Sequence, residues 1–250
     1  MNLADLIDAD DMLRARDMRR EAYLTRATAF LHRHFAPALS TLSDGDIRGG
    51  ILDAANETRQ AGLSSEKDHL NFLIARMLLG RRFMLNPALH SLLYRAGWLD
   101  DDGYPARVFT FAPLFQQIDQ RELVLAGDLA SSHGLVRRFA RLYQPGAPQG
   151  ISALAMVLPA LSRTIRQREA EALASLSDQA VAALGLPGDD RDSFLCIAAL
   201  LGCEFYRDPF HARIARALGQ HPPGSDAQRE AYAGALAQTL QARLRPMAQG

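Results

Sequence analysis

FLIARMLLGRRFMLNPALHSLLYRAG, residues 72–97, aligns without a gap on FLCIAALLGCEFYRDPFHARIARALG, residues 194–219. The offset between the two segments is 122 residues, from 72 to 194. The positions that are identical in both segments are Phe72/Phe194, Leu73/Leu195, Leu78/Leu200, Leu79/Leu201, Gly80/Gly202, Phe83/Phe205, Pro87/Pro209 and Gly97/Gly219. This self-similarity indicates that one helical unit occurs twice in the chain.

The identical residues stand where one helix ends and the next begins. Gly80 and Gly202 each follow an apolar run, which suits the left-handed position after a helix C-terminus. Asn86 and Asp208 each precede a proline, and this pair of residues is typical of an N-cap followed by the first helical position. Each segment therefore predicts a helix, a glycine stop, a turn with a buried phenylalanine, and a second capped helix.

Further helices are predicted on both sides of the repeated segments. The expected ranges are 10–35, 43–61, 65–80, 120–130, 134–143, a helix from 151 onward, and 226–244. Ala36-Pro37 should stop the first of them, and Ser43 should cap the second. The sequence therefore predicts an all-α fold with two pseudo-repeated helical units in one compact chain. The expected division is 1–100 for the first helical unit, 101–120 for a connector and 121–250 for the second helical unit.

Composition and charge are those of an ordinary water-soluble protein. The chain has 28 basic and 28 acidic residues and 48% hydrophobic residues, so no global field attracts nucleic acid or an anionic membrane. Acidic residues at the N-terminus do not fit a signal peptide, and no apolar stretch is long enough to span a bilayer. We therefore expect a cytoplasmic protein, with neither a membrane nor a nucleic acid as its partner.

Histidine, cysteine and acidic residues form no recognisable catalytic or metal-binding pattern. His32 and His34 are two residues apart, so a straight helix points them in different directions. Cys196 and Cys203 are separated by roughly 10 Å along one predicted helix, which is too far for a disulfide. Because phosphate-binding loops and zinc-binding helices are also absent, the sequence assigns no catalytic residue, no metal ligand and no cofactor. An all-α enzyme whose site residues are dispersed in the sequence is an open alternative.

The first unit carries a pattern that is similar to a known group of proteins. The residues concerned are Leu42-Ser43, Ile47, Ile51, Ala54-Ala55, Gly62-Leu63, Ser65-Glu66, Asp68, Phe72-Leu73, Leu79-Gly80, Phe83 and Pro87. They resemble small helical accessory proteins that are encoded beside type VI secretion spike and effector genes in Proteobacteria. The resemblance covers residues 28–97, with a degenerate second copy at 185–219, and Asn86 departs from it by replacing an acid before Pro87.

The resemblance implies a non-enzymatic cytoplasmic adaptor or chaperone that acts through protein contacts. The implied partner is a type VI secretion effector or a spike protein. An immunity protein that blocks a cognate toxin is the alternative within the same setting.

Four aromatic residues between the repeats are the predicted protein-binding site. Tyr104, Phe109, Phe111 and Phe115 lie among Gly and Pro residues that interrupt helical continuity, so we expect this connector to lie outside the helices. Exposed aromatic side chains are frequent anchors of protein interfaces. The alternative is that these residues seal the junction between the two units.

Overall fold

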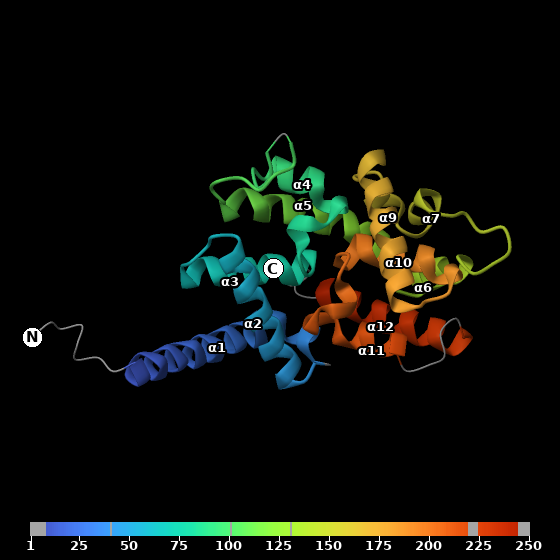
Figure 1. The fold of residues 1–250 in the computed structure, drawn as a ribbon. Helices are drawn as coiled ribbons and strands as arrows, with labels where there is room; N and C mark the ends of the chain where they lie inside the picture. Colours follow the sequence, from blue (N-terminus) through green and yellow to red (C-terminus); the bar gives the residue numbers. More distant parts are fainter. Residues whose placement is uncertain (1–8, 41, 101, 131, 220–224, 245–250) are drawn as a thin grey trace, which may run out of the picture.

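The computed structural model describes residues 9–40, 42–100, 102–130, 132–219 and 225–244, and within these residues the fold is all-α (Figure 1). The helices are α1 (Ala9–Leu39), α2 (Asp44–Gln60), α3 (Glu66–Leu79), α4 (His90–Arg95), α5 (Phe111–Leu129), α6 (Ser132–Arg141), α7 (Ile151–Val157), α8 (Pro159–Ser162), α9 (Gln167–Leu184), α10 (Arg191–Leu201), α11 (Ala212–Gly219) and α12 (Asp226–Leu244). Short 3-10 turns are η2 (Phe83–Leu85), η3 (Pro87–Leu89), η4 (Gly188–Asp190), η5 (Phe205–Arg207) and η6 (Pro209–His211). The predicted fold class is confirmed.

Helix α1 projects from the rest of the chain before it joins the core (Figure 1). Its residues 17–22 are all exposed, and burial begins with Leu24, Ala27 and Leu31. The backbone leaves helical geometry at Phe35 (φ −129°, ψ 20°), and a further turn containing Pro37 continues to Leu39. The predicted stop at Ala36-Pro37 is therefore a kink, because a proline is tolerated in the first turn after a break.

Local capping chemistry sets the start of α2. The Ser43 hydroxyl accepts from the backbone N–H of Asp46, and the Asp46 carboxylate accepts from the Ser43 backbone N–H, which is a capping box. Ser65 accepts in the same way from the Asp68 backbone N–H at the start of α3. The predicted N-termini of these two helices are confirmed.

The repeated segments fold into the same order of local elements. Gly80 (φ 93°, ψ 170°) ends α3, and Gly202 (φ 93°, ψ 155°) ends α10. Two 3-10 turns follow in each segment, and Phe83 and Phe205 are buried as predicted. The superposition of the two units as wholes stays a prediction.

The predicted caps before the two prolines are also observed. The Asn86 side chain accepts from the backbone N–H of Ala88, and the Asp208 side chain accepts from that of Phe210, both at 3.1 Å. These caps start short 3-10 turns, and only then do α4 and α11 begin. The fourth helix therefore begins a turn later than predicted.

Each repeated segment places its capped turn against the opposite unit. Asn86 Nδ2 donates to the carbonyl oxygen of Ala198 at 3.5 Å, and the corresponding Asp208 accepts from Arg76 Nη2 at 3.1 Å. Turn η3 contacts α9, and turn η6 contacts α2. In the same way, Phe210 packs in the buried cluster of α1, α2 and α3. The two repeated segments therefore each contribute to buried contacts with helices that are distant in the sequence.

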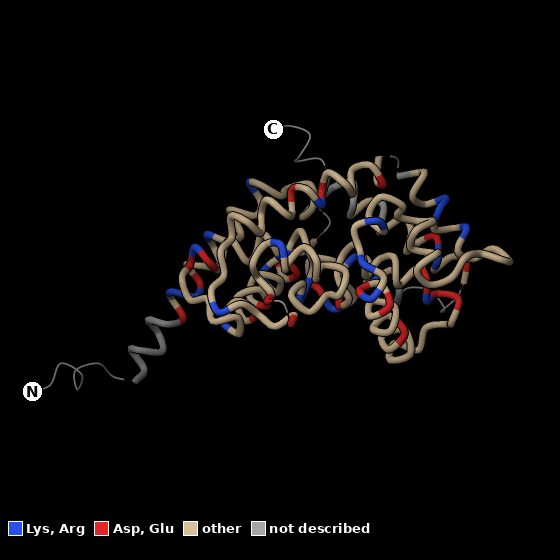
Figure 2. Tube along the Cα trace, turned by 90° about the horizontal axis from the view of Figure 1, so that it is seen from above, with Lys and Arg blue, Asp and Glu red and all other residues tan. Residues whose placement is uncertain are grey.

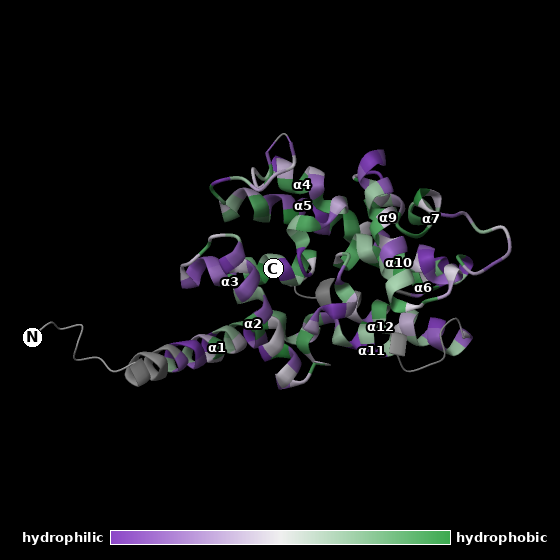
Figure 3. Cartoon of the chain, in the orientation of Figure 1, coloured by the Kyte–Doolittle hydropathy of each residue, from purple (hydrophilic) through white to green (hydrophobic). Residues whose placement is uncertain are grey.

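Buried apolar residues form three clusters, and the hydrophobic colour in Figure 3 gathers largely where helices face one another. One cluster joins α1 to α3 and another surrounds Trp98, while the largest is built from α5 to α12. Cys196 is fully buried in α10, whereas Cys203 is partly buried beyond the end of this helix, so the prediction that both lie in one helix is wrong. Both are free thiols, as predicted, and burial raises the pKa of Cys203 to about 12. No helix of the described residues is long and apolar enough to cross a membrane.

For the helix predicted at 120–130, the predicted first residue is wrong, because the observed helix α5 begins at Phe111. Pro113 is the third residue of this helix. In the first turn of a helix the backbone N–H groups have no intrahelical acceptor, so a proline, which lacks an N–H, is tolerated there. Leu114 and Ile118 pack with the cluster around Trp98, and the later Leu125 belongs to the largest cluster. A single helix thus runs across the predicted boundary at 120, while the division into units stays a prediction.

Basic and acidic residues are interspersed over the trace, as Figure 2 shows. Arg26 pairs with Glu66 at 2.8 Å and Arg48 with Glu21 at 2.7 Å. The local pairing agrees with the balanced charge of the sequence. Exposed pairs of this kind contribute little to stability.

Candidate functional site

A cleft of about 450 Å³ lies between the two units, and we call it the inter-unit cleft. Its first wall is formed by residues 84–87 and 90 together with Leu99, Asp102 and Gly103, and its second wall is formed by Arg168, Glu169 and Ala172 of α9. The exchange of turns described above produces this cleft, because η3 reaches across to α9. Clefts between two packed units are common binding sites.

A buried carboxylate forms the floor of the inter-unit cleft. Glu169 is 4% exposed, and it accepts from the Ser91 hydroxyl at 2.6 Å and from the Arg166 backbone N–H at 2.9 Å. His90 Nδ1 lies 3.7 Å from the same carboxylate. The Glu169 charge is therefore held by donors from both units.

The second nitrogen of His90 faces the loop that closes the cleft on one side. His90 Nε2 lies 2.7 Å from the position that a Cβ atom on Gly103 would occupy. A side chain at position 103 would therefore clash with His90, and the φ of +84° at Gly103 also favours glycine. The imidazole thus lies between the Glu169 carboxylate and the loop backbone.

One large apolar side chain is exposed in the inter-unit cleft, and a second exposed aromatic residue follows a lining residue in the sequence. Leu85 is 69% exposed and lines the cleft directly. Tyr104 is 68% exposed and follows Gly103, which is also a lining residue. Leu99 also lines the cleft but is only 5% exposed, and Asp102 and Arg168 add charged groups, so the walls carry both apolar and charged side chains.

The four predicted binding residues do not share one environment. Phe109 and Phe111 pack on the buried Trp98, with ring centroids at 4.7 Å and 5.1 Å. Phe115 stacks on Phe111 at 6.0 Å, and both lie in α5. The expectation that the whole connector lies outside helices is therefore wrong for these two residues. Tyr104 alone is largely exposed.

Trp98 explains why the connector is held close to the first unit. Its indole Nε1 donates to the carbonyl oxygen of Thr110 at 2.8 Å, and the Ala106 backbone N–H donates to the Trp98 carbonyl at 3.0 Å. Leu99 and Pro105 form an isolated antiparallel bridge. Three of the four aromatic residues thus pack with the cluster around Trp98, while both their role in binding and a role in sealing the junction between the units stay predictions.

Exchanging Tyr104 and Phe109 for Ser one at a time should separate these two environments. Tyr104→Ser should leave the free energy of unfolding within about 0.5 kcal/mol, because the side chain is exposed. Phe109→Ser should cost about 2 kcal/mol, since a partly buried ring loses part of the 3–5 kcal/mol of a buried one. Urea unfolding of both variants gives the comparison, and equal losses would contradict the assignment.

A second polar cluster lies between α6, α10 and α12. The Tyr143 hydroxyl donates to Ser193 Oγ at 2.9 Å, and the Arg229 guanidinium lies 4.1 Å from the centre of the Tyr143 ring. Burial raises the pKa of the Asp190 carboxyl and of the Tyr143 hydroxyl. The space that they enclose is only about 10 Å³, which is the size of one water molecule. This enclosed space has no room for a substrate, although Tyr143 and Arg229 also line an adjoining open cleft of about 420 Å³.

The close histidine pair and the Ser131-Ser132-His133 run of the sequence form no site among the described residues. His32 and His34 are both exposed on α1, and Ser131 lies outside the described residues. Within the part of the chain that the structure describes, no group of three or more His, Cys, Asp or Glu residues is placed to hold a metal ion.

Sequence reasoning missed the residues on the floor of the inter-unit cleft. Ser91 and Glu169 are 78 residues apart, and they meet only because the units exchange turns. Glu169 also accepts from the backbone at the start of α9, but the residue three positions earlier is Arg166 rather than the usual Ser or Thr. No local signal therefore distinguished this carboxylate.

Comparison of the chain with family models, with curated proteins and with solved structures finds no match.

Proposed function

We propose that this chain is a non-enzymatic adaptor that binds a segment of a partner protein in the inter-unit cleft. The observation that carries this proposal is the exposure of Leu85 in the inter-unit cleft, together with the exposed Tyr104 that follows the lining residue Gly103. A type VI secretion effector as the partner, and a role as its chaperone, rest on the resemblance of residues 28–97 alone.

The chemistry of the inter-unit cleft favours an apolar anchor on the partner. Leu85 supplies apolar contact surface, and the exposed Tyr104 offers a large ring at low cost in conformational entropy. The Glu169 carboxylate already accepts from two donors, so it demands no further charge from a ligand. A protein segment with one large apolar side chain meets these conditions.

Binding to the products of genes that flank its own gene tests the proposal. Each product is co-purified with the wild-type chain, and the dissociation constant is measured for the one that binds. Leu85→Ser and Tyr104→Ser should each weaken binding at least tenfold, because each removes an anchor contact. Leu123→Ser is the matched control, because Leu123 is 74% exposed on α5 and does not line the inter-unit cleft.

Three results would contradict the adaptor proposal. They are the absence of binding to any flanking product, equal affinity of the cleft variants and the wild type, and an equal loss in the Leu123 control. If the bound product is a toxin, its activity separates two roles. A chaperone leaves the toxin active in the complex, whereas an immunity protein abolishes its activity.

One observation favours an enzyme as the second candidate. His90 Nδ1 lies 3.7 Å from a buried carboxylate, and a carboxylate beside an imidazole is the arrangement that orients a general base. Its other nitrogen faces Gly103, and the His90 side chain is 31% exposed where it lines the cleft. His90→Gln should abolish turnover in an enzyme but should leave partner binding within about twofold in an adaptor.

A further inference from the structure

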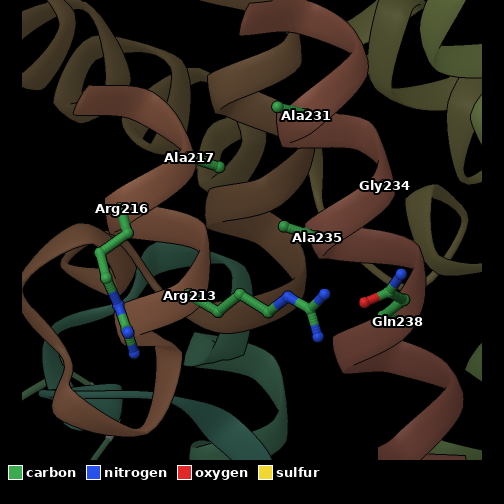
Figure 4. A pocket seen from close by; sticks show the side chains of 7 residues that line it. All are labelled: Arg213, Arg216, Ala217, Ala231, Gly234, Ala235 and Gln238. Atoms are coloured by element: carbon green, nitrogen blue, oxygen red, sulfur yellow. The ribbon is translucent and has the colours of Figure 1, made fainter. Parts of the chain in front are cut away.

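A groove of about 580 Å³ runs between α11 and α12, on the opposite side of the second unit from α9 (Figures 1 and 4). Arg213 and Arg216 project from α11, and Gln238 projects from α12. Figure 4 shows the Arg213 side chain extending across the groove toward Gln238. The polar groups that line this groove are therefore two guanidinium groups and one amide.

The positive charge of this groove is not neutralised from within. None of the lining residues is acidic. Arg216 pairs with Asp46 of α2 at 3.2 Å, so its charge is already shared. The Arg213 side chain forms no ion pair with any residue that the structure describes, and Arg213 is partly exposed. An anionic ligand would supply the negative charge that pairs with the Arg213 guanidinium group.

The floor of the groove consists of residues with little or no side chain. These residues are Ala217, Ala231, Gly234 and Ala235. A Cβ atom added to Gly234 would meet no atom within 4 Å, so space is open above this part of α12. Small residues on two neighbouring helices allow the backbone of a third helix to approach closely.

We propose that the groove between α11 and α12 binds an acidic helix of a partner protein, with Arg213 as the residue that receives a carboxylate. Charge complementarity favours acidic side chains on the partner, because the described residues that line the groove include two guanidinium groups and no carboxylate. The floor of Ala and Gly residues favours a helix as the bound segment, because small side chains allow a helix backbone to approach closely. Nucleic acid fits less well, since the groove offers no aromatic side chain on which a base can stack.

A labelled helical peptide made of Ala and Glu is the probe for this groove. Fluorescence anisotropy should show binding to the full-length wild-type chain that weakens as salt is added. Arg213→Glu should weaken binding at least tenfold, and Arg213→Lys should retain most of it because the charge remains. Gly234→Leu should also block binding without lowering the melting temperature, because it fills open space and replaces a helical glycine.

Matched controls make the outcome decisive. Arg163→Glu reverses an exposed charge beside α8, outside the groove, and should bind the peptide like the wild type. A peptide with Gln in place of every Glu should not bind. Absence of peptide binding, equal losses in Arg213→Glu and Arg163→Glu, or tighter binding of a single-stranded oligonucleotide of equal charge would overturn the proposal. Leu85→Ser should bind the peptide normally, so failure here is distinct from failure at the inter-unit cleft.

Discussion

Gly80→Ala should destabilise the chain by about 4 kcal/mol or more, because two costs add at one position. The backbone at Gly80 has φ 93° and ψ 170°, a region that is essentially restricted to glycine. A Cβ atom there would also lie 1.7 Å from the carbonyl oxygen of Leu201, which belongs to the end of α10. Since the clash is with backbone of the other unit, α3 and α10 would have to move apart.

A graded series of glycine variants tests this explanation by urea unfolding. Gly202→Ala should cost less than Gly80→Ala, because its backbone strain is similar but its nearest contact is 3.3 Å away. Gly185→Ala should cost only about 1 kcal/mol, since Gly185 is left-handed with no atom near its Cβ position. Gly127→Ala in α5 should be neutral or stabilising. Equal losses at Gly80 and Gly185 would contradict a role for the contact between units.

The parts of the fold that depend on short-range chemistry could be predicted from the sequence. Ser43 and Ser65 cap their own helices, and their partners are three residues away. Gly80 and Gly202 end apolar helices, which requires only the backbone freedom of glycine. The start of α5 was missed because Pro113 was interpreted as a break, although a helix tolerates proline in its first turn.

The candidate sites could not be predicted, because they depend on how distant segments are placed. The floor of the inter-unit cleft brings together Ser91 and Glu169, and the groove brings together Arg213 and Gln238. Alignment of the two repeated segments identifies corresponding residues, but it does not show that each capped turn crosses to the opposite unit. Tyr104 is the predicted residue that lies beside a cleft, and its aromatic neighbours instead pack on Trp98.

The contact between the units is centred on one fully buried arginine. Arg76 Nη1 donates to the carbonyl oxygen of Gly50 at 2.7 Å, and its Nη2 donates to Asp53 at 2.8 Å and to Asp208 at 3.1 Å. Its Nε lies 3.5 Å from the Glu57 carboxylate. Burial, the largest influence, raises the pKa of Glu57 despite this positive neighbour. Ala198 occupies the corresponding position in the second segment, so the network has no counterpart there.

Arg76→Met should lower the free energy of unfolding by about 3–5 kcal/mol at pH 7, because buried carboxylates then lose their cation. Arg82→Met is the matched control. Arg82 pairs with Glu204 at 3.1 Å but is about half exposed, so its loss should cost no more than about 1 kcal/mol. Urea unfolding at pH 7 gives both values, and equal losses would contradict the importance of burial.

The pH dependence of the Arg76→Met deficit separates uncompensated charge from lost packing. Without Arg76, the pKa of the folded-state Glu57 carboxyl should rise further, so the folded state binds a proton that the unfolded state releases. Stability from this group is fully present below the unfolded pKa, about 4.3 for a glutamate, and is lost as pH rises through the raised folded pKa. The difference in stability between wild type and variant should therefore shrink as pH falls from 7 toward about 4.3. A deficit that stays constant over this range would show that Arg76 acts through its packing, because the volume lost in a cavity does not titrate.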